Sequence, residues 1–246
     1  MLKNNEKERV KIGIPGLDSI VHGGFIRGSN ILISGGTGTG KTIFCMQFLY
    51  NGATKYDEAG VFVTLEERPN ELRTEAAKLG YDFETLEEEN KLIIIDAASS
   101  RASLPSMEKY AVRRGFDINT LAQEIYRATK DLGAHRIAID SLSGLGIKFE
   151  GLLEIRTAIF KLSALLNELE CTSVMTSEIP IGGSWSRFGV EEFIAQGVVI
   201  LFLEEEKGEL RRSFVVRKMR GSSHSLKRFP FEITDHGIIV MPGGEL

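Results

Sequence analysis

The sequence predicts an α/β fold, with a mostly parallel central sheet flanked by helices and a set of antiparallel strands near its C-terminal end. A glycine-rich loop at residues 35–42 follows a short apolar run and precedes a helical pattern. Beyond it, short apolar runs alternate with helical patterns, which indicates strands that alternate with helices. From residue 198 onward, strand-like runs are joined by short polar turns, which indicates hairpins. Without an internal repeat or a linker, residues 1–246 are expected to form one domain.

Residues 35–42 read GGTGTGKT and fit Gly-x4-Gly-Lys-Thr, the pattern of a phosphate-binding loop. Glycines at this spacing let successive backbone N–H groups point at phosphate oxygens with no Cβ in the way. We expect Lys41 to reach the β- and γ-phosphates as a point charge and the Thr42 hydroxyl to bind Mg²⁺. The apolar run at 30–33 and the helix that opens after the loop supply a context that a flexible glycine linker lacks. The loop is therefore interpreted as a nucleotide site.

A second apolar run, residues 61–65, predicts a core strand that ends at Glu66 and Glu67. Pro69 follows in the first turn of a helix whose apolar positions continue up to Gly80. Carboxylates before a helix commonly stabilise its dipole, which would account for one of the pair or for both. Because strand ends in open α/β sheets point at the ligand crevice, we favour a catalytic pair that polarises the water attacking the γ-phosphate. Which of the two is the base stays open.

Apolar runs at residues 92–95 and 136–139 predict two more strands. The second ends at Asp140, the position from which phosphate-loop enzymes hold the Mg²⁺ shell opposite the loop threonine. A further strand at 173–178 ends in polar side chains that either sense the γ-phosphate through water or simply close the strand. Helical patterns lie at residues 69–79, 121–132 and 154–169. Frayed or exposed segments are expected at residues 1–10, 84–89 and 97–118.

The C-terminal third predicts paired strands and a basic surface. The strand-like runs lie at residues 198–203, 213–216, 231–233 and 238–240. Residues 211–228 are rich in arginine and lysine, and exposed strand charges alone explain about half of these. The tight cluster at 218–221, Lys-Met-Arg-Gly, suggests a phosphate partner. The loop at 180–190 combines Trp185 with an arginine, a combination that stacks bases, but a single arginine attracts nucleic acid weakly.

Composition and charge limit the classes of function. The net charge of −4 and the isoelectric point near 5.7 exclude a polycation that coats nucleic acid. The apolar share of 42% suits a soluble globule with a sizeable core. Cys45 and Cys171 have neither metal-site nor disulfide spacing and are expected to be buried in a reducing compartment. With no visible signal peptide and no apolar run of about 20 residues, a cytoplasmic protein without a membrane span is expected.

Several motifs occur together and in chain order, and the set resembles a single-domain KaiC-like ATPase of the RecA superfamily over about residues 11–240. The motifs are Gly16-Leu17-Asp18, His22-Gly23-Gly24, the phosphate loop, Glu66-Glu67, Ile139-Asp140-Ser141, Gly189-Val190-Glu191-Glu192-Phe193, Lys218-Met219-Arg220-Gly221 and Ile233-Thr234-Asp235-His236-Gly237. The Lys-Met-Arg-Gly block and the Ile-Thr-Asp-His-Gly ending are the specific ones. The resemblance implies a RecA-like phosphate-loop fold, ATP hydrolysis with Mg²⁺, and a homo-oligomeric, hexameric ring with ATP between protomers.

The resemblance also implies a role for each site residue. Glu66 and Glu67 match the family's catalytic carboxylate pair and would act with Lys41. Lys218 and Arg220 match side chains that reach the ATP of the neighbouring protomer and stabilise charge developing on its γ-phosphoryl group. The residues expected to line the phosphates are Gly36, Thr37, Gly38, Thr39, Gly40, Lys41, Thr42 and Ile43. Those expected near the base and sugar are Met219, Ser222, His224 and Asp235.

The chain also departs from the family pattern. Lys78 stands where the family often has a nucleotide-contacting serine. The clock protein of the family has two such domains and a phosphorylated Ser-Thr pair in the second, whereas the nearest positions here, Glu192 and Phe193, have no hydroxyl. Clock-type autophosphorylation therefore has no acceptor at that place, although Ser222 and Ser223 lie near the expected ATP.

Three functions are compatible with these residues. The leading hypothesis is ATP hydrolysis in a homo-oligomeric ring, used in signalling or in the regulation of a partner. The basic stretch 211–228 and the aromatic loop 180–190 also support a DNA-binding recombination ATPase resembling the RadA paralogues, but the acidic isoelectric point and the lack of a zinc-type cysteine cluster weigh against it. An autokinase would use the same ATP site.

Overall fold

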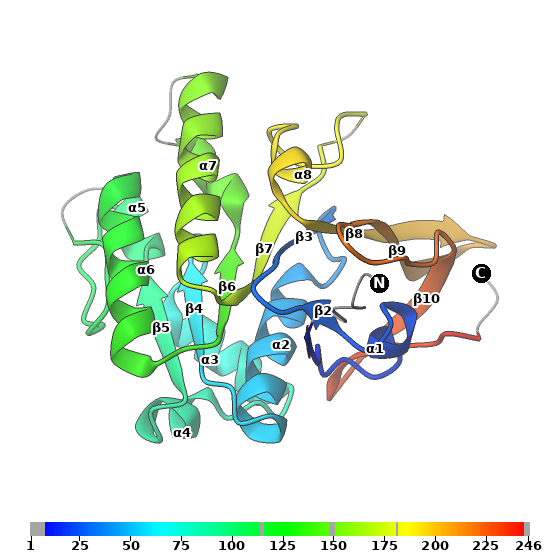
Figure 1. Cartoon of the computed structure of the whole chain (residues 1–246), viewed down its shortest axis with the longest axis horizontal. Coiled ribbons are helices and arrows are strands. Elements are labelled where there is room, and N and C mark those ends of the chain that lie inside the picture. The colour runs from blue at the N-terminus through cyan, green and yellow to red at the C-terminus, as the bar shows by residue number, and fades with distance from the viewer. Residues whose placement is uncertain (1–7, 114–115, 148–150, 181, 244–246) are drawn as a thin grey trace, which may run out of the picture.

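One nine-stranded sheet forms the centre of the molecule (Figure 1). The computed structural model describes residues 8–113, 116–147, 151–180 and 182–243, and the statements on the fold refer to these residues. The strand order is β11-β10-β9-β8-β3-β7-β6-β4-β5. The strands from β8 to β5 in this order run parallel, and β9, β10 and β11 extend the sheet as antiparallel strands. The fold class expected from the sequence is confirmed.

The strands of the sheet occupy the predicted runs. They are β3 (Asn30–Gly35), β4 (Gly60–Thr64), β5 (Leu92–Asp96), β6 (Arg136–Asp140), β7 (Thr172–Glu178), β8 (Gly197–Glu206), β9 (Glu209–Met219), β10 (Arg228–Thr234) and β11 (Gly237–Val240). The pair β8–β9 is longer than the apolar runs at 198–203 and 213–216, because charged residues at its outer end also pair, as Glu204 does with Arg211. Polar residues thus extend the hairpin beyond the part that hydrophobicity reveals.

Helices cover both faces of the sheet and bury two apolar cores. On one face lie α2 (Lys41–Lys55), α3 (Pro69–Lys78) and α4 (Phe83–Glu88). On the other lie α6 (Ile118–Leu132) and α7 (Leu152–Glu168), side by side in Figure 1. The short helices are α1 (Leu17–Ile20), α5 (Ala98–Arg101), η1 (Leu142–Ile147) and α8 (Glu191–Ile194).

The central strand β3 contributes to both cores. Ile31 and Ile33 pack in the core on the α2 face, whereas Leu32 packs in the core on the α6 face. This alternation follows from the pleat of a strand, which points successive side chains to opposite faces. A strand buried on both faces reads as a continuous apolar run, which is the pattern that predicted this strand.

Local signals set the ends of helix α6. The side chain of Asp117 accepts a hydrogen bond from the backbone N–H of Thr120 at 3.0 Å and so caps the first turn. Gly133 ends the helix in a left-handed conformation with φ of 65°, which an L-residue with a Cβ adopts at a cost. Between these ends Leu121 and Ile125 are fully buried, as the predicted apolar face requires.

Two expectations for exposed segments were wrong in part. Arg9 and Val10, in the terminus that was expected to fray, form β1 (Arg9–Val10), which pairs with β2 (Phe25–Ile26); residues 1–7 lie outside the described residues. The segment 97–118, expected as a variable loop, contains α5 and a bridge between Asp96 and Ala111. Short polar helices and two-residue strands carry too few apolar positions for a periodicity argument to find them.

Arg136, at the start of β6, is a fully buried cation that joins the N-terminal segment to the sheet. Its Nε donates to Glu58 Oε2 at 2.7 Å, and its Nη1 and Nη2 donate to the carbonyls of Phe48 and Lys11 at 2.9 and 2.8 Å. The guanidinium carbon also lies 4.6 Å from the centre of the Phe48 ring. A buried charge with a complete set of partners is tolerated, whereas a partner left alone is strongly destabilising.

Substitution Arg136→Ala should therefore destabilise the fold. It leaves the half-buried Glu58 carboxylate and two buried carbonyls without this partner, and we expect a loss of about 3–5 kcal/mol in the free energy of unfolding. Urea unfolding at constant pH measures it. The matched control is Arg127→Ala, which breaks an exposed pair with Glu124 and should cost about 1 kcal/mol or less. Equal effects of the two substitutions would contradict the proposed role of Arg136.

Candidate functional site

The parallel strands bring several predicted site residues to one edge of the sheet. In the register of the sheet, Gly35 stands opposite Glu178, and Thr64 stands opposite Asp140. The loops that follow β3, β4, β6 and β7 therefore leave the sheet side by side, at the carboxyl ends where ligands of open α/β sheets bind. The glycine-rich loop, the Glu66–Glu67 pair and Asp140 meet at this edge, which we call the phosphate edge.

The glycine-rich loop curls in front of helix α2. Gly38 and Gly40 have φ of 76° and 96°, conformations that favour glycine. Lys41 Nζ donates to the carbonyls of Gly35 and Gly36 at 2.9 and 2.8 Å, and Thr39 Oγ1 donates to Gly36 at 2.8 Å. The first N–H groups of α2 have no acceptor within the helix, so this turn suits an anion.

Lys41 lies among carboxylates. Burial lowers the pKa of its ammonium group, and the negative charges of Asp140, Glu178 and Glu66 act in the opposite direction. These three side chains therefore lie within electrostatic range of the lysine. Glu178 was not singled out from the sequence, where it reads as an ordinary strand end.

Asp140 and Thr42 face each other across the loop. Burial raises the pKa of Asp140, while hydrogen bonds from Thr176 and Thr42 and the charge of Lys41 lower it. One carboxylate and one hydroxyl are the oxygen ligands that Mg²⁺ commonly takes from a protein in nucleotide sites, with phosphates and water completing the shell. The two side chains thus fit the predicted metal site. The hydrogen bond of Thr176 also shows that this strand end supports Asp140.

Glu66 and Glu67 lie at the phosphate edge but in different surroundings. Burial raises the pKa of Glu66, a hydrogen bond from Ser141 lowers it, and the charges of Asp140 and Glu178 raise it. Burial raises the pKa of Glu67 to about 7, and the next contribution comes from Glu75 on α3. The charge of Glu66 thus acts on Lys41, whereas the charges that act on Glu67 are, largest first, those of Glu75 on α3 and of Asp140.

Lys218 and Arg220, the Lys218–Arg220 pair below, lie at the opposite edge of the same sheet. Lys218 pairs with Val198 near the start of β8, and the N–H of Arg220 donates to the carbonyl of Gln196 at 2.8 Å. Gln196 in turn donates to Asn30 at 2.9 Å, which places Arg220 level with the beginning of β3. From there to Gly36 the strand spans roughly 20 Å at about 3.3 Å per residue. The pair cannot reach the phosphate loop of its own protomer.

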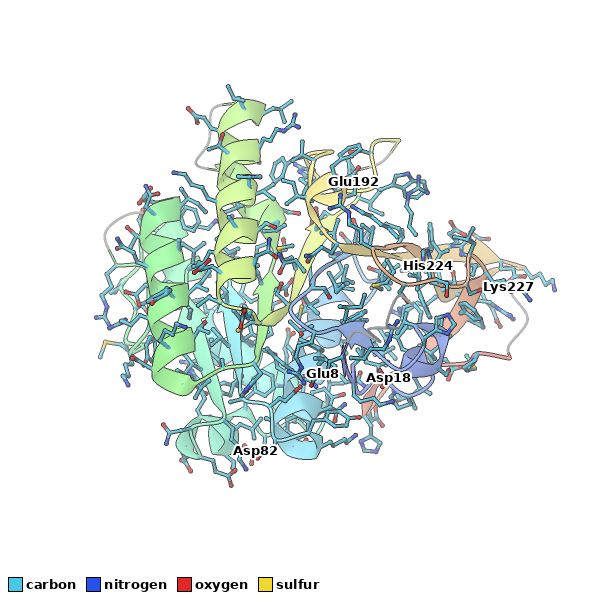
Figure 2. The ribbon with its side chains drawn as sticks, in the orientation of Figure 1. Glu8, Asp18, Asp82, Glu192, His224 and Lys227 are labelled. Carbon is cyan, nitrogen blue, oxygen red and sulfur yellow. The ribbon has the colours of Figure 1, made fainter. Side chains whose placement is uncertain are left out.

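The residues predicted near the base and sugar fall into two places. Ser222 and His224 follow β9 at the same edge as the Lys218–Arg220 pair, and Figure 2 labels His224 there. Both ring nitrogens of His224 are buried, and neither has a hydrogen-bond partner among the described residues. Met219 is 5% exposed, so its side chain belongs to the core. Asp235 lies in the β10–β11 turn, where Tyr81 Oη, which follows α3, donates to the carbonyl of the next residue, His236, at 2.8 Å.

Sequence reasoning missed a contact to the loop from a distant strand. Arg212 Nε on β9 donates to the carbonyl of Gly38 at 3.1 Å. Arg212 belongs to the basic stretch 211–228 and is opposite Leu203 in the β8–β9 ladder. Its place beside the loop could have been predicted only from the register of that hairpin. Thr37 and Ile43 lie on the loop and at the start of α2, where they were expected, and Lys78 is exposed in the last turn of α3.

Part of the basic stretch has partners within the chain. Arg228 pairs with Glu204 at 2.7 Å, and Arg211 lies 3.6 Å from Glu209. Arg217 lies over the ring of Trp185 at 4.6 Å, which occupies the aromatic face that a base would need. These contacts weaken the case for a nucleic-acid groove. Among the described residues, no helix combines the length and the apolar character that a membrane span requires.

Comparisons with known proteins agree with this geometry. The family described as "ATPase: KaiC" matches residues 10–245. A UPF0273 protein of Methanocaldococcus jannaschii is 46% identical over 96% of this chain and 97% of its own length. The circadian clock oscillator protein KaiC of Synechococcus elongatus is 41% identical over 99% of this chain. The chain covers 47% of the length of that relative. A crystal structure of a KaiC-like protein from Pyrococcus horikoshii, 44% identical, superposes with a TM-score of 0.84 over 96% of this chain and 100% of that one.

The resemblance drawn from the motifs is thereby confirmed. The match covers the phosphate loop, the carboxylates at the phosphate edge and the Lys218–Arg220 pair at the other edge, and it agrees with the RecA-like strand order described above. The chain belongs to the KaiC family of ATPases.

Proposed function

We propose that this protein hydrolyses ATP with Mg²⁺ in a homo-oligomeric ring, with each ATP between two protomers, and that turnover regulates a partner or a signal. The observation that carries the proposal is the separation of the two predicted half-sites. The phosphate loop and the Lys218–Arg220 pair lie at opposite edges of one sheet, roughly 20 Å apart along β3. Head-to-tail assembly brings the pair of one protomer to the phosphate edge of the next.

Each half-site would contribute a distinct part of the chemistry. On the phosphate edge, the loop N–H groups and Lys41 hold the phosphates in line for attack. Thr42 and Asp140 would hold Mg²⁺, which when bound neutralises charge on the β- and γ-phosphate oxygens. The Lys218–Arg220 pair of the adjacent protomer stabilises the charge that develops on the γ-phosphoryl group, as an arginine finger does. His224, on the same side as this pair, would contact the base or sugar of that nucleotide.

Steady-state release of phosphate from MgATP, with and without single-stranded DNA, tests the function directly. A slow rate that DNA leaves unchanged supports the regulatory ATPase. A several-fold stimulation that fades with added salt would instead support the recombination ATPase. Radioactive phosphate retained on the denatured protein would assign autokinase activity.

Glu66 is the better candidate for the base, because its charge acts on Lys41, while the largest charge effect on Glu67 comes from Glu75 on α3. The base works without its proton, so kcat/KM should rise with pH as Glu66 ionises, above its ordinary value of 4.5. Glu178→Gln removes a like charge that raises the pKa of Glu66. The rising limb of the profile of kcat/KM against pH should therefore move to lower pH. Glu66→Gln should lower turnover by about 10²–10⁴.

Rate profiles of the free enzyme between pH 4.5 and 8 measure this limb, since kcat/KM reports groups of the unliganded protein. A limb near pH 7 that survives Glu66→Gln and disappears in Glu67→Gln would assign the base to Glu67, whose pKa is about 7.

Arg220→Ala should lower turnover by about 10³-fold or more and leave ATP binding intact. An arginine finger stabilises the transition state, whereas the phosphate loop of the other protomer binds the ATP. The matched control is Arg217→Ala, which removes an exposed cation from β9, the strand that Arg220 follows, and should leave the rate unchanged. Mixed rings of Arg220→Ala and Lys41→Ala protomers should recover part of the activity. The first keeps an intact phosphate loop and the second keeps an intact Lys218–Arg220 pair, so a complete site forms where the two meet. An assembled Arg220→Ala ring with the normal rate would refute the proposed role of the pair.

A further inference from the structure

Glu191 is a buried carboxylate to which the chemistry proposed above assigns no role. It opens helix α8 and is 1% exposed. Its two oxygens accept hydrogen bonds from Ser177 Oγ at 2.9 Å, Ser186 Oγ at 2.7 Å, Phe188 N at 3.3 Å and Val190 N at 3.1 Å. Ser186 Oγ also contacts Glu192 Oε2, and its single proton serves one of the two carboxylates at a time. The other donors, Ser177 Oγ and the two N–H groups, are satisfied together by a carboxylate, which only accepts. Such a buried, saturated carboxylate fixes the position of the helix that carries it.

One side of this cluster is attached to the strands of the phosphate edge. Ser177 is fully buried in β7 and stands opposite Ser34, the residue before the phosphate loop begins. Ser177 Oγ accepts from the N–H of Arg187 at 2.9 Å, and Ser34 Oγ donates to the carbonyl of Trp185. The segment that leads into α8 is therefore anchored to the two central strands of the sheet.

On its other side, the cluster holds the helix α8, whose carbonyls contact the Lys218–Arg220 pair. Lys218 Nζ donates to the carbonyls of Glu192 and Ala195 at 2.9 and 2.6 Å, and Arg220 Nη2 donates to that of Phe193 at 3.3 Å. These carbonyls belong to α8 and the residue after it, and Figure 2 shows Glu192 on this helix. The direction of both cations is thus set by where α8 lies.

We propose that Glu191 is a positioning residue: through α8 it aims Lys218 and Arg220 at the nucleotide of the adjacent protomer. The inference rests on the proposed function, because it concerns the pair that acts between protomers. Lysine and arginine side chains have many rotamers, and a displacement of about 1 Å in a catalytic group costs up to about 10²-fold in rate. A rigid carboxylate cluster between the sheet and α8 removes that freedom before the neighbour's ATP is engaged.

The isosteric substitution Glu191→Gln tests the geometry with little change in shape. The amide group presents donors to Ser177, Ser186 and the two N–H groups, so part of the cluster loses its acceptors. We expect kcat to fall about 10- to 100-fold while the affinity for a fluorescent ATP analogue and the size of the assembly stay within about twofold. Glu191→Asp keeps the charge and should recover part of kcat. Glu168→Gln, an exposed carboxylate at the end of α7, is the control for loss of charge.

Mixed rings separate positioning from a general loss of structure. In a mixture of Arg220→Ala and Lys41→Ala protomers, the first supplies the nucleotide site and the second supplies the pair. Adding Glu191→Gln to the Lys41→Ala protomer should lower the recovered activity by the same amount, about 10- to 100-fold. Adding it to the Arg220→Ala protomer, whose pair is already inactive, should leave that activity within about twofold. If Glu191→Gln does not assemble, Ser186→Ala, which removes one donor of the cluster, takes its place in both arrangements.

Equal losses in the two arrangements, or an unchanged kcat in the fully substituted ring, would overturn the proposal for Glu191. A failure of the proposed function has a different signature: Arg220→Ala and Lys41→Ala protomers would then recover no activity even with Glu191 intact.

Discussion

The parallel register of β3 with β7 and β8 is the constraint on which the whole site depends. It sets Gly35 opposite Glu178 and Leu201, so the loop after β3 emerges between neighbours that end at the same edge. The same register fixes where the basic block lies. Because β9 returns antiparallel along β8, the residues that close it end at the amino-terminal edge of the sheet. The register of these strands therefore brings the residues of the phosphate edge together and places Lys218 at the opposite edge.

Burial then sets the electrostatics of the phosphate edge. It raises the pKa values of Glu66, Glu67 and Asp140 and lowers that of Lys41, so burial disfavours the charged form of these four groups. The free-energy cost of burying these charges is reduced by the attraction between Lys41 and the carboxylates. A site of this kind is poised to exchange its internal partners for ligand phosphates and a divalent cation, whose charges are larger than any in the protein.

The sequence predicted the regular elements well where hydrophobicity decides them. β3 and α6 have apolar patterns long enough to recognise, and motif spacing located Lys41, Thr42 and Asp140 without knowledge of the packing. It could not locate contacts that depend on register between distant strands, such as Arg212 on Gly38. Nor did it distinguish Glu66 from Glu67, because adjacent residues at a strand end differ only in which neighbours they meet. Glu191 was visible only as part of a family motif, since burial of a carboxylate has no signal in a single sequence.

The hydrogen bonds of Lys41 to Gly35 and Gly36 bear on which anions the loop can select. The lysine already has acceptors from its own backbone, so a ligand gains only the difference between those contacts and the ones it offers. A small anion such as inorganic phosphate satisfies the N–H groups of the turn but competes weakly for an ammonium group that is already engaged. A ligand of this loop therefore has to replace both carbonyl contacts of the lysine as well as satisfy the N–H groups of the turn.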